Sequence, residues 1–502
     1  MTPALPREYN SIAIPQEREL LTKVTFPLGV EEGETRDMPQ ENCGVVGVYA
    51  PGEDVARITF FGLFALQHRG QESAGISVSD GETLRLSTSM GLVAQAFREQ
   101  DLERLTGHIA IGHTRYSTAG SSILCNAQPI LVSGPYGEIA LAHNGNVVNA
   151  VPLRKELEEW GIQFSASTDS EIIAHLLANA PGRDWGERVQ YLMRRVQGAY
   201  SLVVLTQDSL IAIRDPLGVR PLCVGKMNGG WIVASESCAL DHLGADLLRE
   251  IEPGEAVVIN QDGMKTIYRA KERNRASCIF EYIYFARPDS IIGGKLTYSL
   301  RQAMGAQLAR EHPVDADVVI GVPDSATAAA VGYAQEAGIP YNEGLLKNRY
   351  VGRTFIEPDQ RVRELGVKLK FNTLPEILSG KRVIVVDDSI VRGTTTPHVV
   401  RLVRKAGATE VHLRVCAPPI KHPCQLGVDM ASYRELIAAN KSIEEIRQFV
   451  DADTLGYLSI EGLLKAVGGS RDSHWLGCFT GNHPIPVQLE LDKLALETAA
   501  TR

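Results

Sequence analysis

Residues 382–396 read RVIVVDDSIVRGTTT, and this run constrains the fold more than any other part of the chain. A β-branched strand leads into two acids and a loop rich in glycine and threonine, and Pro397 opens a helical stretch. A loop that opens a helix offers converging backbone N–H groups, to which Ser389 and Thr394–Thr396 add hydroxyl donors. The run therefore predicts an α/β domain with a phosphate-binding loop.

Two other interpretations of this run compete with a phosphate loop. The Walker-B-like strand end of a nucleoside triphosphatase goes with a Gly-x-x-x-x-Gly-Lys-Ser/Thr sequence, and the chain contains none. An ordinary strand end followed by a helix cap would not need paired acids and a string of hydroxyls. Phosphate binding is thus the favoured interpretation.

The run resembles the phosphoribosyl pyrophosphate signature of the type I phosphoribosyltransferase family. The resemblance implies that Asp387 and Asp388 meet the ribose hydroxyls. It implies that the 5′-phosphate is held by the loop residues Ser389, Arg392, Gly393, Thr394, Thr395 and Thr396. Upstream, residues 318–326 (VVIGVPDSA) resemble the pyrophosphate loop of the family. Mg²⁺ is then expected near Ser325, Asp387 and Asp388, bridging pyrophosphate and ribose oxygens with few protein ligands.

Residues 347–370, between these two motifs, carry seven basic and three acidic side chains in a chain of net charge −9. A solvated loop or charged helix face would explain such a stretch. Its place beside a pyrophosphate site favours a flexible loop that closes over the substrate and excludes water. Lys347 and Arg349 are accordingly expected to bind phosphoribosyl pyrophosphate.

Cys43 is the second strong feature, because the 42 residues before it resemble a removable segment. They are rich in Glu, Pro and Thr, show no sustained apolar period and lack the basic start and apolar run of a secretory signal. A free thiol with a pKa of about 8.5 is mostly protonated at neutral pH, and an α-amino group on the same residue is a well-placed base. That group exists only if the Asn42–Cys43 bond is cut. The alternative is a buried cysteine that opens a strand.

Four motifs follow Cys43 in a fixed order: residues 67–75 (QHRGQESAG), 112–118 (GHTRYST), 143–146 (HNGN) and 167–171 (STDSE). Together with Cys43 they resemble the N-terminal-nucleophile glutaminase domain of class II amidotransferases. Short apolar runs at 45–49, 109–111, 139–143 and 202–205 predict buried strands, and residues 171–179 predict a helix. This pattern fits the four-layered αββα sandwich that the resemblance implies.

The resemblance assigns roles to five residues. Cys43 is the nucleophile, and Asn144 and Gly145 form the oxyanion hole, where each donor is worth a few kcal/mol. Arg115 holds the α-carboxylate of glutamine and Asp169 its α-ammonium. Taken singly, Arg115 would more often be a surface ion pair, and Asn144–Gly145 an ordinary hairpin turn.

Both domains in this order resemble the glutamine phosphoribosylpyrophosphate amidotransferases. The resemblance implies a propeptide at 1–42, a glutaminase domain at 43–275 and a type I phosphoribosyltransferase α/β domain at 276–430. Residues 432–467 carry apolar side chains at helical spacing, among them Leu436, Ile437, Ile446 and Val450, which predicts a helical extension with a tail at 431–502. It implies that ammonia from glutamine passes inside the protein to phosphoribosyl pyrophosphate, giving 5-phosphoribosylamine, glutamate and pyrophosphate. Two rivals are a class II amidotransferase with another acceptor and a regulatory protein that uses a phosphoribosyltransferase fold.

One branch of this family has a structural 4Fe-4S cluster, and three cysteines of this chain match its ligands: Cys278, Cys424 and Cys478. Trp475 stands where the fourth cysteine is expected, and an indole cannot bind iron. His474 is a conceivable substitute ligand. Loss of the cluster, with the indole filling part of its volume, is the favoured interpretation.

Length and composition set the remaining bounds. A chain of 502 residues predicts two or three domains, and no apolar stretch reaches the ~20 residues that span a bilayer. The negative net charge argues against a nucleic-acid partner. Eight dispersed cysteines without an export signal favour reduced thiols or metal ligands over a disulfide scaffold, and they favour the cytoplasm. A homotetramer inhibited by purine nucleotides is expected from the family alone.

Overall fold

The computed structural model describes residues 43–116, 120–271, 275–348, 371–424, 426, 432–483, 485 and 496–497. These residues belong to one compact unit that spans 36–502. The predicted propeptide, Arg349 and the rest of the predicted flexible loop lie outside the described residues. Among the described helices, none has the length and apolar character needed to cross a membrane.

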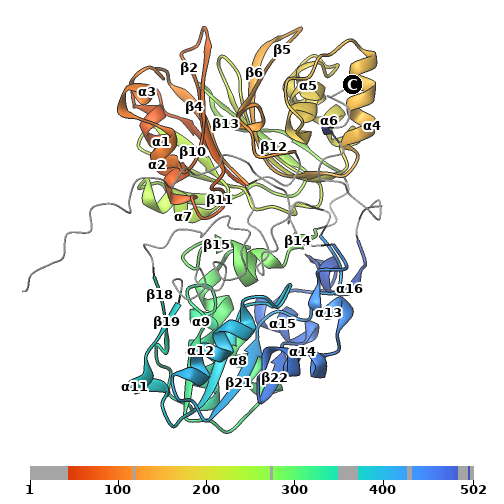
Figure 1. The fold of residues 1–502 in the computed structure, drawn as a ribbon. Coiled ribbons are helices and arrows are strands. Elements are labelled where there is room, and N and C mark those ends of the chain that lie inside the picture. The colour runs from red at the N-terminus through yellow and green to blue at the C-terminus, as the bar shows by residue number, and fades with distance from the viewer. Residues whose placement is uncertain are drawn as a thin grey trace, which may run out of the picture. The chain divides into compact units, whose positions relative to one another are not determined.

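A seven-stranded antiparallel sheet contains the strand that follows Cys43 (Figure 1). Its order is β11 (Asp246–Glu250), β9 (Cys223–Met227), β10 (Gly230–Ala234), β1 (Gly44–Tyr49), β4 (Ile109–Arg115), β2 (Ser73–Ser79) and β3 (Leu84–Met90). β1 is buried on both faces, because Val45 and Tyr49 enter one apolar core and Val46 and Val48 another. The strand after the nucleophile is thereby fixed from both sides.

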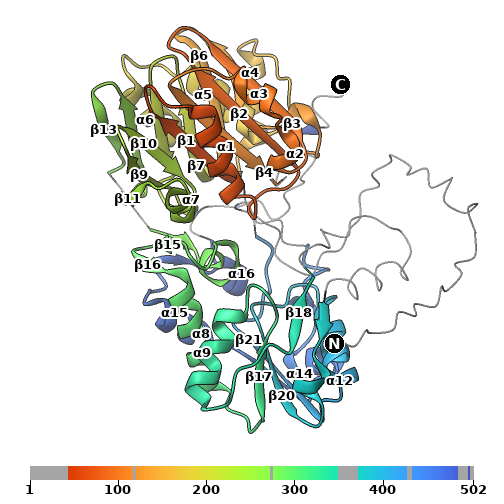
Figure 2. The ribbon, with the colours of Figure 1, turned by 90° about the vertical axis from the view of Figure 1, so that its left-hand side faces the viewer.

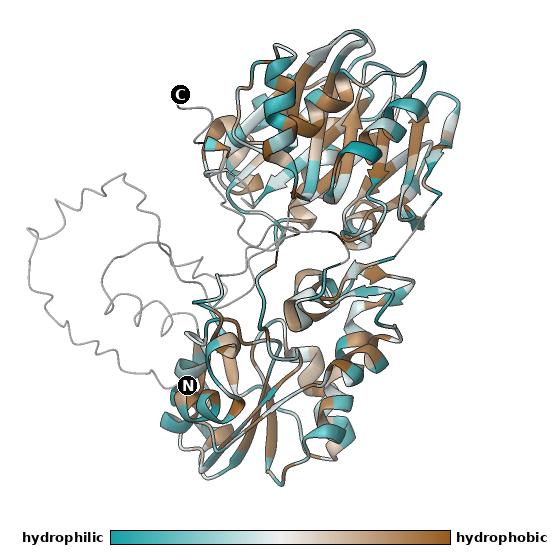
Figure 3. Ribbon diagram, turned by 90° about the vertical axis from the view of Figure 1, so that its right-hand side faces the viewer, coloured by the Kyte–Doolittle hydropathy of each residue, from teal (hydrophilic) through white to brown (hydrophobic). Residues whose placement is uncertain are grey.

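A second, six-stranded antiparallel sheet packs against the first. Its order is β13 (Gly263–Arg269), β12 (Glu255–Asn260), β8 (Leu210–Arg214), β7 (Gly198–Leu205), β6 (Gly137–Val147) and β5 (Ile130–Gly134). The core between the sheets joins Val45 and Ile111 to Ala142 and Val203. In Figure 3 the strands carry many of the hydrophobic segments of this half.

Helices cover the outer faces of both sheets (Figure 2). The seven-stranded sheet is covered by α1 (Val55–Ala65), α2 (Val93–Ala96), α3 (Glu99–Glu103) and α7 (Ser237–His242). The six-stranded sheet is covered by α4 (Ala150–Glu159), α5 (Asp169–Ala178) and α6 (Trp185–Arg195). A short turn, η1 (Leu124–Asn126), precedes β5. The predicted αββα sandwich and its predicted strands are confirmed.

Short elements follow the sandwich along the chain. They are β14 (Ser277–Cys278), the helical turn η2 (Glu281–Phe285), β15 (Ile291–Ile292) and β16 (Lys295–Leu296). β14 pairs in parallel with β23 (His474–Trp475), and α16 (Gly477–Thr480) follows β23.

A four-stranded parallel sheet forms the centre of the second half. Its order is β17 (Val318–Gly321), β20 (Arg382–Asp387), β21 (Glu410–Val415) and β22 (Thr454–Tyr457). One face packs on α8 (Thr297–Glu311), α9 (Thr327–Ala337) and α15 (Ile460–Val467). The other packs on α11 (Pro375–Leu378), α12 (Thr396–Lys405) and α14 (Ile443–Val450). A two-stranded ribbon joins β18 (Leu345–Lys347) to β19 (Phe371–Thr373). The predicted α/β domain is confirmed.

The segment after residue 431 is only partly helical. It forms α13 (Ile437–Asn440), α14 and α15, as the helical spacing of its apolar residues predicts, and Ile437 and Ile446 pack in the core of the second half. Residues 454–457 were expected in the helical extension and instead form β22. Parallel pairing of β22 with β21 satisfies the backbone of this strand. The sheet therefore draws its last strand from beyond the expected domain boundary.

Candidate active sites

Cys43 lies at the start of β1 and is buried, with a side chain that donates from Sγ to the carbonyl oxygen of Tyr116 at 3.3 Å. Burial raises the pKa of the Cys43 thiol to about 11. A thiol with this pKa is protonated at neutral pH, so it needs a base before it can attack. The buried surroundings of Cys43 thus create a need for a nearby base, which is the role predicted for a free α-amine.

A pocket opens at Cys43 and is lined by residues from five separate segments. It is lined by Cys43, Arg115, Tyr116, Gln128, His143, Gly145, Thr168, Asp169 and Ser170. Four of the five residues predicted for the glutaminase site line this pocket, although they lie up to 126 positions apart in the numbering. The fifth, Asn144, precedes Gly145 on β6.

Asn144 and Gly145 lie inside β6 and pair with Ser201 and Tyr200 of β7, so the alternative of a hairpin turn is wrong. A glycine is required at 145, because its φ is 154° and a Cβ would lie 1.9 Å from the carbonyl oxygen of Ala199. The amide of Asn144 is buried, and neither of its polar atoms has a hydrogen-bond partner among the described residues. A buried amide without a partner is suited to meet a ligand.

Arg115 ends β4 and is buried, so the alternative of a surface ion pair is wrong. Its guanidinium donates to the carbonyl oxygens of Ser121 (3.1 Å) and Gly120 (3.4 Å), and Glu72 lies 3.7 Å away. These contacts fix the orientation of the guanidinium group, whose paired N–H donors can hold a carboxylate.

Asp169 is the first residue of α5, with Thr168 as the N-cap. Its Oδ2 accepts a hydrogen bond from the backbone N–H of Val147 at 3.0 Å, and Oδ1 lies 3.9 Å from Nδ1 of His143. Burial lowers the pKa of His143, which keeps this ring neutral. The negative charge of Asp169 is therefore available to an ammonium group in the pocket.

Sequence reasoning missed several residues that line this pocket. Tyr116, Thr168 and Ser170 are neighbours of predicted residues, so the motifs themselves could have pointed to them. Gln128 lies just before β5, and its Oε1 accepts a hydrogen bond from the backbone N–H of His143 at 2.8 Å. Nothing in the local sequence around Gln128 signals that contact.

The predicted phosphate loop runs from the end of β20 to the start of α12. Asp387, Asp388 and Ser389 are buried at the carboxyl end of β20, and Thr394 is exposed. Gly393 has a φ of 74°, and a Cβ there would lie 2.6 Å from Cδ1 of Ile437. The structure therefore places the predicted loop residues in one turn, supported by α13.

Both oxygens of Asp388 meet hydroxyl groups. Oδ1 accepts from Ser389 Oγ at 2.6 Å, and Oδ2 accepts from Ser325 Oγ. Burial raises the pKa of the Asp388 carboxyl, and the charge of Arg301 opposes this shift. Ser325, from the loop after β17, thus contacts Asp388. These oxygen donors suit Mg²⁺, although no group of three or more His, Cys, Asp or Glu side chains in the described residues is arranged to hold a metal ion.

Two basic residues of the predicted site have acidic neighbours. Lys347 Nζ donates to Oδ2 of Asp324 at 2.8 Å on the surface of the protein. Arg392 Nη2 lies 3.6 Å from Oε2 of Glu435, which belongs to the segment after residue 431. The structure brings Lys347 to the loop after β17, and it brings Arg392, within the loop after β20, next to Glu435.

The three cysteines matched to an iron–sulfur cluster lie together. With Trp475 they line a pocket that also includes Val219, Arg220, Phe280 and Leu426. β14 and β23 pair so that Cys278 stands beside Trp475. Burial raises the pKa of Cys278 to about 12 and that of Cys478 well above its ordinary value, so both thiols are neutral.

This donor set does not fit a 4Fe-4S cluster held by four thiolates. The indole N–H of Trp475 is a donor only, and it cannot bind iron. His474 is no substitute, because its neighbour Trp475 takes the pocket side of β23. The His474 ring instead packs on Tyr282 at 5.6 Å, and its Nδ1 contacts Ser473 Oγ at 2.9 Å.

Protein purified under anaerobic conditions is expected to contain only background iron and acid-labile sulfide. Trp475→Cys supplies a fourth thiol at this pocket and should take up iron and sulfide on anaerobic reconstitution, whereas the control Trp475→Phe should not. A full complement of iron and sulfide per chain in the unaltered protein would contradict the loss of the cluster.

Comparison with known proteins agrees with both sites. The family model "Glutamine amidotransferase domain" matches residues 113–242, and "Phosphoribosyl transferase domain" matches residues 300–452. The amidophosphoribosyltransferase of Synechococcus elongatus is 49% identical over 473 residues, which cover 93% of this chain and 96% of the relative. That of Bacillus subtilis is 48% identical over 452 residues, 89% of this chain and 95% of the relative.

Solved structures show the same likeness. The glutamine phosphoribosylpyrophosphate amidotransferase of B. subtilis, complexed with ADP and GMP, matches with a TM-score of 0.84 and 47% identity over 89% of this chain and 98% of that one. An allosteric regulatory enzyme of purine biosynthesis matches with a TM-score of 0.85 and 47% identity, over 91% and 98%.

The αββα sandwich with its cysteine pocket and the parallel sheet with its acidic loop define a glutamine amidotransferase joined to a phosphoribosyltransferase. The chain belongs to the amidophosphoribosyltransferase family. It is thus a glutamine-dependent pentosyltransferase of purine biosynthesis.

Proposed function

We propose that Cys43, freed at its α-amine by removal of residues 1–42, attacks the amide carbon of glutamine. The α-amine takes the proton of the thiol, whose raised pKa of about 11 makes such a base necessary. The amide of Asn144 and the backbone N–H of Gly145 stabilise the oxyanion of the tetrahedral intermediate. The intermediate collapses to a thioester as the C–N bond breaks, and the α-amine returns its proton to the leaving ammonia. Water then hydrolyses the thioester to glutamate. The observation that carries this assignment is the pocket in which Cys43, Arg115, Gly145 and Asp169 meet.

Arg115 and Asp169 hold the two charged ends of the glutamine backbone. The buried guanidinium of Arg115 pairs with the α-carboxylate, and the Asp169 carboxylate pairs with the α-ammonium. Opposite charges at fixed positions orient the side-chain amide of the substrate toward Sγ of Cys43.

Phosphoribosyl pyrophosphate binds at the carboxyl end of β20. Asp387 and Asp388 accept hydrogen bonds from the ribose hydroxyls, and Ser389, Arg392, Gly393 and Thr394–Thr396 hold the 5′-phosphate. Lys347 and Arg349 contribute positive charge to the pyrophosphate. Ammonia attacks C1 of the ribose, pyrophosphate leaves, and the acidic pair stabilises the positive charge that develops on the ring.

Mg²⁺ is the cofactor that the acceptor site would use. Ser325, Asp387 and Asp388 supply the oxygen atoms that such an ion prefers, and the ion would neutralise the charge of the leaving pyrophosphate. Purine nucleotides are the proposed inhibitors, since the B. subtilis relative was solved with ADP and GMP. A homotetramer in the cytoplasm completes the proposal. Its domain boundaries lie at 43 and 276, and its transferase domain extends beyond 431 to include β22.

Purified protein supplied with phosphoribosyl pyrophosphate and Mg²⁺ is expected to release pyrophosphate with either glutamine or ammonia. In the glutamine reaction, glutamate and pyrophosphate should form in equal amounts. Pyrophosphate release that needs neither nitrogen source, or glutamate formation without pyrophosphate, would contradict the proposed function.

A further inference from the structure

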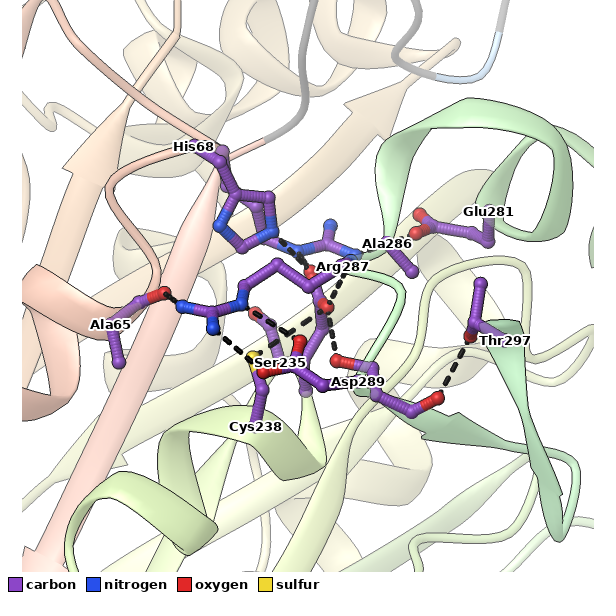
Figure 4. A network of polar contacts seen from close by, with 12 residues as sticks. Ala65, His68, Ser235, Cys238, Glu281, Ala286, Arg287, Asp289 and Thr297 are labelled. Atoms are coloured by element: carbon purple, nitrogen blue, oxygen red, sulfur yellow. Dashed lines mark hydrogen bonds and ion pairs between the residues drawn. The ribbon is translucent and has the colours of Figure 1, made fainter. Parts of the chain in front are cut away.

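Arg69, from the motif at 67–75, takes part in neither proposed site, yet it is buried and contacts residues of both halves of the chain. Its neighbour His68 and its partner Glu281 are labelled in Figure 4. Its Nε donates to Oε1 of Glu236 in the glutaminase half. Its Nη2 donates to Oε2 of Glu281 at 2.5 Å, on the turn η2. One guanidinium therefore joins the glutaminase to the start of the transferase half.

Glu236 receives donors from both halves. Its Oε1 contacts Nε2 of His68 at 2.7 Å in addition to Arg69. Its Oε2 accepts from Ser290 Oγ at 2.5 Å and from the backbone N–H of Arg287 at 2.9 Å. The strongly lowered pKa of Glu236, which Arg69 and His68 cause against the effect of burial, keeps this carboxylate charged.

A second arginine completes a cluster of two positive and two negative side chains. Arg220 Nη1 lies 3.4 Å from Oε1 of Glu281, and its Nη2 donates to the carbonyl oxygen of Leu426 at 2.7 Å. The exposed fractions of the side chains of Arg69, Glu236, Glu281 and Arg220 are 1%, 0%, 3% and 0%. We call these four residues the interdomain charge cluster.

The glutaminase end of this cluster adjoins the glutamine pocket. A Cβ at Gly44, the residue after Cys43, would lie 3.5 Å from Cβ of Arg69. Gly70, the residue after Arg69, packs so closely on β4 that a Cβ there would lie 2.7 Å from the backbone nitrogen of Arg115. A displacement of Arg69 therefore acts directly on the strands that carry Cys43 and Arg115.

The other end of the cluster adjoins the acceptor site. Arg301 of α8 donates to the carbonyl oxygens of Tyr282 (2.9 Å) and Ala286 (2.8 Å), which precede the residues held by Glu236, Arg287 and Ser290. Ile283 of η2 also shares an apolar core with Val386 and Val391, which lie on either side of the acidic pair in the chain. The segment from Glu281 to Ser290 is thus held by the cluster on one side and by Arg301 on the other.

Buried charges of this kind tolerate little displacement. Each carboxylate has lost its water and depends on donors in fixed positions, so a shift of either half leaves a charge without its partner. Two halves that pass ammonia from one site to the other need such a fixed relative position. A gap between them admits water and lets ammonia escape as ammonium.

We propose that Arg69 and Glu281 are positioning residues that hold the glutaminase and transferase halves in register, so that ammonia made at Cys43 reaches the acceptor site. The inference rests on the proposed function and adds the residues that couple its two steps. Neither side chain touches a substrate.

The test compares Glu281→Gln with Glu255→Gln as the matched control. Glu255 is also a carboxylate with an exposed side-chain fraction of 0%, but its partners Arg249 and Arg269 lie within the glutaminase half. Glutamate and pyrophosphate are measured in the same glutamine reaction, the ammonia-dependent rate is measured separately, and thermal unfolding reports on folding. A purely structural role would lower all rates together and leave the ratio of glutamate to pyrophosphate unchanged.

Glu281→Gln is expected to raise that ratio about threefold or more, because ammonia escapes, while Glu255→Gln keeps it near one. If Glu281→Gln does not fold, Ser290→Ala is the test variant, because it removes one donor from Glu236 without leaving a charge unpaired. The ratio of glutamate to pyrophosphate should also rise in Ser290→Ala. A ratio near one in every folded variant would overturn the inference. Unaltered protein that releases no pyrophosphate with glutamine would overturn the proposed function and the inference with it.

Discussion

Cys43→Ala is expected to abolish glutamine-dependent synthesis and to spare ammonia-dependent synthesis. Removing a nucleophile that forms a covalent intermediate costs roughly four orders of magnitude or more, because no other group can form the thioester. Ammonia supplied from solution bypasses the thioester and needs only the acceptor site. The measurement is the rate of pyrophosphate release with each nitrogen source.

Cys223→Ala is the control for this variant. Cys223 is another buried cysteine of the same sheet, and its Sγ donates to the carbonyl oxygen of Ala234 at 3.4 Å, much as Cys43 contacts Tyr116. It lies outside the pocket and should keep both activities. Equal loss of both activities in Cys43→Ala, with normal unfolding, would count against a division of the chemistry between two sites.

Replacing both Asp387 and Asp388 by asparagine is expected to stop synthesis with either nitrogen source. A hydrogen bond to a charged group contributes about 1.5–3 kcal/mol, so two of them correspond to a loss of roughly 10²–10⁴ in rate. Glutamine hydrolysis at Cys43 does not use these carboxylates. The measurement is pyrophosphate release together with glutamate formation.

Asp317→Asn serves as the control in the same sheet. Asp317 accepts hydrogen bonds from Arg382, the first residue of β20, whereas Asp387 is the last residue of that strand. This change removes one carboxylate at the opposite end of β20 and should leave turnover near its original value. Retained ammonia-dependent turnover in the double variant would refute the assignment of the acidic pair.

The glutaminase site could be predicted from the sequence because each motif lies on one short element. Arg115 ends β4, Asn144 and Gly145 share β6, and Asp169 begins α5. Each motif is therefore intact as a string of neighbouring residues. Gln128 was not predicted, because its contact with His143 depends on how distant segments meet in the folded chain.

The strand and loop of the candidate acceptor site could be predicted for the same reason, since the strand, the acids and the loop of residues 382–396 are continuous. The last strand of the parallel sheet, β22, was not predicted. Residues 454–457 carry no long β-branched run, and only parallel pairing with β21 gives them their conformation. Tertiary contacts decided this element, against the helical spacing of the residues before it.

The interdomain charge cluster had no signal in the sequence at all. Arg69 lies 167 positions from Glu236 and 212 positions from Glu281. A single arginine in a polar motif is usually solvated, so only the fold reveals that this one is buried between two carboxylates. The pocket of the three cysteines, in contrast, could be predicted from the sequence, because the motif alone shows Trp475 in place of a cysteine.

The fate of the amide nitrogen of glutamine tests the central claim most directly. The protein is given phosphoribosyl pyrophosphate, Mg²⁺, glutamine carrying heavy nitrogen in its amide, and excess unlabelled ammonium at a pH well below the pKa of ammonium. The product amine is trapped, and its nitrogen isotope is measured by mass spectrometry. The account predicts that the product carries mostly heavy nitrogen, because ammonia formed at Cys43 reaches the acceptor inside the protein. Product with the isotope ratio of the whole ammonium pool would contradict it.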